Sequence, residues 1–78
     1  MKLMEEVTEI FRMVFDIPEL IITEKTNALH IDGWDSVAQI NLIITFEEKY
    51  NLSFTTEEIS RLTCVGDMLN LLQAKGAR

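Results

Sequence analysis

The sequence has almost none of the cysteine that stabilises many very small proteins through disulfides. Its 78 residues include one cysteine, Cys64, so no disulfide can form within the chain. A reducing compartment is therefore the simpler expectation. No apolar run approaches the roughly 18 to 20 residues that span a bilayer, and the first residues turn acidic at once instead of forming a secretory signal. We expect a soluble, cytoplasmic monomer with no membrane association.

Basic residues are also scarce, and this limits the possible partners. Seven Lys and Arg stand against 13 Asp and Glu, which gives a net charge of −6. Nucleic acid is an unsuitable partner because its binding depends on clustered positive charge. Between Asp32 and Glu58 six carboxylates face a single lysine, Lys49. This acidic stretch is either a solvated helical face or a surface that attracts a basic partner.

Groups able to do chemistry are few. His30 is the only histidine, and its neighbours Asp32 and Ser36 bring to mind a hydrolytic triad. The serine lacks the flanking glycines of a nucleophile elbow, and three such residues within one short loop are poorly placed to orient one another. One histidine and one cysteine are too few for a zinc site. The sequence therefore predicts no catalytic apparatus and no metal centre.

The spacing of apolar residues predicts a single all-α domain over residues 1–78, a small bundle of three main helices and one short helix. The main helices are expected from the start of the chain to Phe15, over about 35–50, and from near Thr63 to Gly76. A short helix begins at Thr55, which with Glu58 has the spacing of a capping box. A long loop joins the first two helices, and five of its apolar residues are candidates to anchor it: Ile17, Leu20, Ile21, Leu29 and Ile31.

The helix expected over 35–50 carries two apolar stripes. Four residues on one side suit the core: Leu42, Ile43, Phe46 and Tyr50. Val37, Ile40 and Ile44 form a second stripe roughly 140° away at 100° per residue. Either the helix packs between neighbours, or the second stripe is exposed for docking. Glu47 and Glu48 flank that stripe, and buried carboxylates without partners are costly. We therefore predict a docking surface of Val37, Ile40, Ile44, Glu47 and Glu48 beside Ser36.

Three segments of the chain resemble the acyl carrier protein family. They are DGWDSV at 32–37, the helix ending FEEKY at 46–50, and TCVGD at 63–67. The central feature is the pair Asp35-Ser36, followed here by Val37 where the family more often has leucine. The resemblance implies that Ser36 receives covalent 4'-phosphopantetheine from coenzyme A through a separate phosphopantetheinyl transferase. The arm's thiol would carry acyl groups between an acyl-loading enzyme (an acyltransferase or a ligase) and a ketosynthase or other biosynthetic enzymes.

The sequence leaves several interpretations of the region around Ser36 open. Asp35 or Ser36 is also suited to cap the helix, and Asp35 to help recruit the transferase. Trp34 is expected to be partly buried. Ala38 and Asn41 are uncharged where carriers of fatty-acid synthesis usually have acids, which favours a specialised pathway such as polyketide synthesis. The alternatives are an aminoacyl or peptidyl carrier, and an unmodified acidic module that binds a basic partner.

Overall fold

The structure, a computed structural model that describes residues 2–77, consists of helices joined by loops. In chain order the helices are α1 (Lys2–Phe15), α2 (Ser36–Tyr50), α3 (Thr56–Ser60) and α4 (Val65–Ala74). Within the described residues no strand forms, and Asn27 and Cys64 make one isolated antiparallel bridge. The predicted set of three main helices, one short helix and a long first loop is confirmed. None of these helices is long and apolar enough to cross a membrane.

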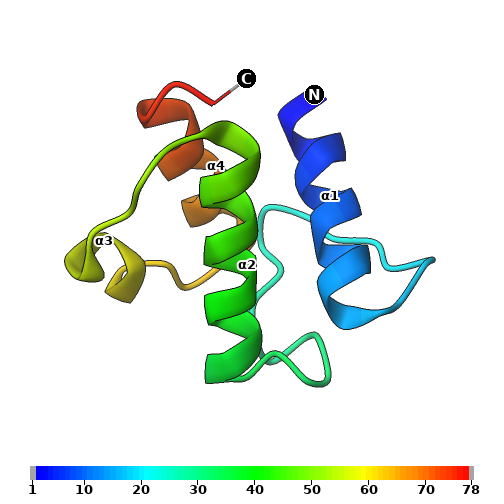
Figure 1. The fold of residues 1–78 in the computed structure, drawn as a ribbon. Helices are drawn as coiled ribbons and strands as arrows, with labels where there is room; N and C mark the ends of the chain where they lie inside the picture. The colour runs from blue at the N-terminus through cyan, green and yellow to red at the C-terminus, as the bar shows by residue number, and fades with distance from the viewer. Residues whose placement is uncertain (1, 78) are drawn as a thin grey trace.

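The core lies between α1, α2 and α4 (Figure 1). One apolar face of each outer helix packs inward: Leu3, Val7 and Ile10 of α1 are buried, as are Val65, Met68, Leu69 and Leu72 of α4. On α2 the predicted core stripe is buried at Leu42, Ile43 and Phe46. Tyr50 is half-buried, and its hydroxyl donates to Glu6 Oε1 at 2.8 Å. Burial of aliphatic and aromatic surface is thus the main stabilising contribution to this fold.

Short-range signals determine where the helices end. At the end of α1, Asp16 adopts a left-handed conformation with φ 55°, and the N–H of Ile17 donates to the carbonyl of Arg12. Asn51 ends α2 in the same way, with φ 54°. At α3 both hydrogen bonds of the predicted capping box between Thr55 and Glu58 are present. These contacts satisfy backbone groups that a helix end leaves without partners.

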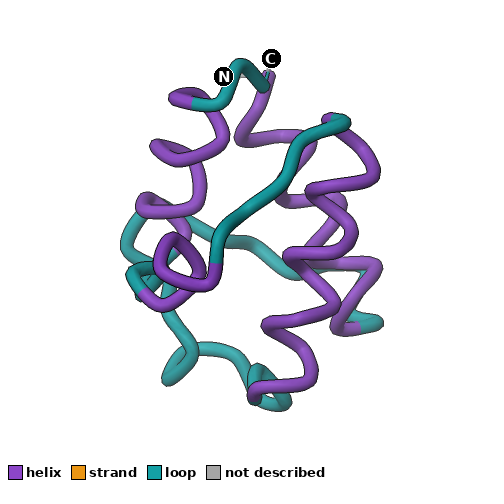
Figure 2. The backbone as a smooth tube through the Cα atoms, turned by 60° about the vertical axis from the view of Figure 1, so that its left-hand side comes forward, coloured by secondary structure: helices purple, strands orange, loops and turns teal. Residues whose placement is uncertain are grey.

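The long loop over 16–35 is tied to α4 by its backbone. The N–H groups of Val65 and Gly66, at the start of α4, donate to the carbonyls of Thr26 and Glu24 at 2.9 and 2.8 Å. The loop therefore caps a helix far from it in sequence. Figure 2 shows this loop and the α2–α3 connection as non-helical segments that run between the helices.

The side chains that anchor this loop differ in part from those expected. Ile31 is buried and Leu20 is half-buried, as predicted. Ile21 and Leu29 were expected to face the core, but they are 80% and 94% exposed, and Ile17 is exposed at 37%. Ile22 takes the inward position instead, together with the buried hydroxyl residue Thr26. A loop without a regular period gives no register, so its inward-facing residues cannot be identified from spacing.

Candidate functional site

Ser36 is the first residue of α2. This helix begins at the end of the bundle opposite the two chain termini (Figure 1). The preceding residue, Asp35, is the N-cap: its Oδ1 accepts a hydrogen bond from the N–H of Ala38 at 2.9 Å. The capping role considered for either residue therefore belongs to Asp35. The hydroxyl of Ser36 is exposed and makes no hydrogen bond to any residue in 2–77. The local fold thus presents a free hydroxyl at a helix N-terminus, where unpaired N–H groups favour an anion.

Trp34 links the start of α2 to the aromatic side chains of α1. Its ring is half-buried, as predicted, and meets Phe11 edge-on with centroids 5.3 Å apart and Phe15 at 6.0 Å. Its indole Nε1–H donates to Gln39 Oε1 at 2.7 Å. This link between Trp34 and Gln39 is not predicted by the apolar spacing of the sequence. The aromatic contacts fix the position of the loop just before Ser36.

A pocket of about 570 Å³ opens beside Ser36. Its walls come from the long loop, the first turns of α2, and the segment around α3: Ala28, Trp34, Asp35, Ser36, Gln39, Ile40, Ile59, Leu62 and Thr63. The sequence did not point to Ile59 and Leu62, although their spacing of three residues is helical and was an available signal. The arrangement places one hydroxyl at the rim of a partly apolar hollow.

Two ionic groups hold the α3 side of the pocket against α4. Glu58 accepts a hydrogen bond from the backbone N–H of Thr55 at 2.8 Å and pairs with Lys75 at 3.0 Å. These contacts, the first above all, lower the pKa of the Glu58 carboxyl. The hydroxyl and N–H of Thr63 both donate to the carboxylate of Asp67 and lower its pKa in the same way. The walls carrying Ile59, Leu62 and Thr63 are therefore fastened by charge-assisted hydrogen bonds.

The second apolar stripe of α2 is exposed. The exposed fractions of Val37, Ile40 and Ile44 are 67%, 56% and 46%. We call these three residues the α2 face. Of the two explanations for the stripe, packing between neighbouring helices is excluded by this exposure. Three adjacent aliphatic side chains on the surface of so small a protein are typical of an interaction site.

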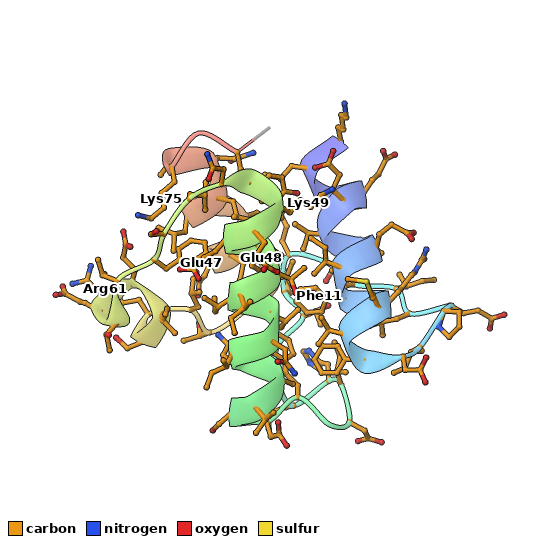
Figure 3. All side chains as sticks on the ribbon, in the orientation of Figure 1. Phe11, Glu47, Glu48, Lys49, Arg61 and Lys75 are labelled. Carbon is orange, nitrogen blue, oxygen red and sulfur yellow. The ribbon has the colours of Figure 1, made fainter. Side chains whose placement is uncertain are left out.

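The two carboxylates beside the α2 face have different surroundings (Figure 3). Glu47 is half-buried, and its Oε2 accepts a hydrogen bond from the N–H of Phe54 at 2.9 Å, in the connection to α3. Glu48 is exposed and lines a shallow groove between α2 and α1. Glu47 thus has a structural contact that spacing could not reveal, whereas Glu48 remains free to meet a basic group.

The other candidate groups do not gather at this site. His30 is exposed, and its Nδ1 accepts a hydrogen bond from the N–H of Asn27 at 3.0 Å. Cys64 is half-buried and precedes α4. Across residues 2–77 no three His, Cys, Asp or Glu side chains are grouped so as to hold a metal ion. The site therefore consists of Ser36, the pocket and the α2 face.

Comparison with known proteins assigns this arrangement to a family. No family model matches the sequence. Among solved structures, the chain is similar to the solution NMR structure of a holo acyl carrier protein from Geobacter metallireducens. The two superpose with a TM-score of 0.89 and share 39% sequence identity, over 96% of this chain and 86% of the other. The chain belongs to the acyl carrier protein family, whose members carry acyl groups.

Proposed function

We propose that this protein carries acyl groups as thioesters on a 4'-phosphopantetheine arm attached to Ser36. The observation that carries the proposal is the free, exposed hydroxyl of Ser36 at the capped N-terminus of α2, beside a pocket. Membership of the acyl carrier protein family, and the holo state of the Geobacter protein, support it. The attachment domain is proposed to span residues 1–78.

The residues around Ser36 suit a covalently bound phosphodiester. The hydroxyl is unobstructed, and the first turn of α2 has N–H groups that side chains leave unpaired apart from Ala38. A bond forms between Ser36 Oγ and the phosphorus of the pantetheine phosphate as the pyrophosphate bond of coenzyme A breaks and the nucleotide leaves. The serine proton passes to a base of the phosphopantetheinyl transferase, which also supplies Mg²⁺. This chain contributes the nucleophilic oxygen and its position.

The arm, when bound, supplies a thiol that holds an acyl group as a reactive thioester. Tethering raises the effective concentration of that group for each enzyme that docks. The protein itself is proposed to be non-catalytic and to act as a monomer in the cytoplasm, where Cys64 stays reduced. Its partners are the transferase, an acyl-loading acyltransferase or ligase, and a ketosynthase or other biosynthetic enzymes.

The α2 face, with Asp35, Glu47 and Glu48 at its borders, is proposed as the docking surface for these enzymes. Ile44→Arg should lower kcat/KM for loading by a phosphopantetheinyl transferase about tenfold, since burying one aliphatic side chain contributes about 1.5 kcal/mol. Ile21→Arg is the matched control, because Ile21 is an isoleucine 80% exposed on the long loop. If Ile44→Arg and Ile21→Arg are both folded and are loaded with equal kcat/KM, the α2 face is not the docking surface.

The pathway is proposed to be a specialised one, polyketide synthesis or a related route, because the early turns of α2 are neutral. From Ser36 to Phe46 the helix contains no charged residue. Enzymes of general fatty-acid synthesis that select acidic carriers should therefore load this protein poorly. A malonyl transferase assay tests this, and efficient malonylation followed by chain elongation would overturn the specialised assignment.

Two other functions remain to be separated by experiment: an aminoacyl or peptidyl carrier, and an unmodified module that binds a basic partner through the α2 face. Intact mass after incubation with a promiscuous phosphopantetheinyl transferase and coenzyme A distinguishes a carrier from the module. We expect a single phosphopantetheine adduct, absent in Ser36→Ala. A folded protein that gains no mass contradicts the carrier function. The native cargo, acyl or aminoacyl, follows from the intact mass of protein isolated with it.

A further inference from the structure

The side-chain amide of Gln39 is held in one orientation by Trp34. An indole nitrogen only donates, so its hydrogen bond of 2.7 Å must go to the oxygen of the amide. The NH₂ group of Gln39 is consequently turned away from the indole. It makes no hydrogen bond to any residue in the described part of the chain. Gln39 therefore has two oriented donors on the pocket wall.

These donors lie on the same side of α2 as Ser36. Residues three apart on a helix have Cβ atoms about 5–6 Å from each other. Helical side chains also lean toward the N-terminus, so that of Gln39 extends back over the first turn. Both residues line the same pocket. This geometry directs the Gln39 amide toward the space that the oxygens of a phosphate bonded to Ser36 Oγ would occupy.

A phosphodiester on Ser36 would find no cation from the adjacent sequence. No Lys or Arg occurs between Lys25 and Lys49, and the charged residues closest in sequence to Ser36 are Asp35 and Asp32. Of the other donors on the pocket wall, Trp34 Nε1 is bonded to Gln39 and the Thr63 hydroxyl to Asp67. Apart from backbone N–H groups, Gln39 supplies the free donors there.

We propose that Gln39, oriented by Trp34, donates a hydrogen bond to a phosphate oxygen of the arm on Ser36. This assignment rests on the proposed function and adds to it a residue that positions the arm. The contact holds the base of the arm at the pocket. It is strengthened because the acceptor is charged, and hydrogen bonds to a charged acceptor are stronger than those to a neutral one. Among residues 2–77 no Lys or Arg lines the pocket, so the neutral amide of Gln39 is the side-chain donor that it offers to the phosphate.

The experiment compares the ¹⁵N-labelled protein before and after loading with a phosphopantetheinyl transferase and coenzyme A. We expect the side-chain NH₂ signals of Gln39 to shift downfield on loading. Those of Asn41, which is exposed on the same helix, serve as the internal control and stay in place. In Trp34→Phe, which keeps an aromatic ring but no indole donor, the Gln39 shift should be reduced because the amide is no longer oriented.

Substitutions at Gln39 test the same contact through the ³¹P resonance of the arm. Gln39→Glu keeps an acceptor for Trp34 but has no donor, and Gln39→Leu has neither. Both should move the ³¹P resonance of the arm, whereas Asn41→Leu should not. The indole N–H signal shows whether Trp34 keeps its partner in each variant.

The outcomes separate this assignment from the proposed function. Unchanged Gln39 NH₂ signals in a fully loaded protein, or an unchanged ³¹P resonance in both Gln39 variants, would overturn the assignment while leaving the carrier function intact. A wild-type protein that gains no mass on loading contradicts the proposed function, and the assignment with it.

Discussion

The N-cap of α2 gives a stability prediction that also separates two roles of Asp35. In the structure its Oδ1 accepts a hydrogen bond from the N–H of Ala38 at 2.9 Å, and α2 begins at the next residue. Replacing an N-cap Asp by Ala costs about 1 kcal/mol, within a range of roughly 0.5 to 2. For a chain of this size 1 kcal/mol corresponds to a fall in Tm of about 4–8 °C. Asp35→Ala should therefore be measurably less stable than the wild type.

Asp35→Asn is the matched control. It keeps an oxygen that can accept from Ala38, so its free energy of unfolding should stay within about 0.5 kcal/mol of the wild type. Urea unfolding followed by circular dichroism at 222 nm measures both variants. If Asn destabilises as much as Ala, charge and not capping is responsible, and the reasoning fails. With the cap retained, slower loading of Asp35→Asn by the transferase would report the docking role of the carboxylate.

Two further predictions concern the supports of the pocket. Gly66→Ala should lower the free energy of unfolding by about 1 kcal/mol, because the new Cβ would lie 3.0 Å from the carbonyl oxygen of Glu24, which the Gly66 N–H now binds. Asn70→Ala, at an exposed position of the same helix, is the control, and equal stability of the two variants would contradict the close approach. The lowered pKa of Glu58 predicts that stability is lost as pH falls from the ordinary carboxyl value of about 4.5 through the lower folded value. Glu58→Gln should flatten the pH dependence of the urea midpoint in that range, and an unchanged profile would show that the contacts with Thr55 and Lys75 contribute nothing.

The helical framework could be predicted from sequence because its signals are local. Apolar spacing identified the segments that form α1 and α4, and the capping box predicted at Thr55 and Glu58 is present in the structure. Two stripes on α2 predicted one buried and one exposed face, although only the structure shows that Val37, Ile40 and Ile44 are exposed.

The parts that sequence did not reveal depend on contacts between distant segments. Ile22 packs inward and Ile21 outward in a loop whose backbone is bonded, at Glu24 and Thr26, to the start of α4. Glu47 was predicted only as a border of the docking surface, yet its carboxylate also binds the N–H of Phe54. The pocket wall from α3 and the bond between Trp34 and Gln39 likewise arise from tertiary packing, which periodicity does not encode.

The central claim, that Ser36 carries the arm, is tested most directly by locating the adduct. Trypsin cleavage after Lys25 and Lys49 releases a peptide in which Ser36 is the only serine, while Ser53 and Ser60 lie outside it. After loading with coenzyme A and a phosphopantetheinyl transferase, tandem mass spectrometry should place one phosphopantetheine on Ser36 within that peptide. An unmodified peptide 26–49, or an adduct on Ser53 or Ser60, would contradict the account.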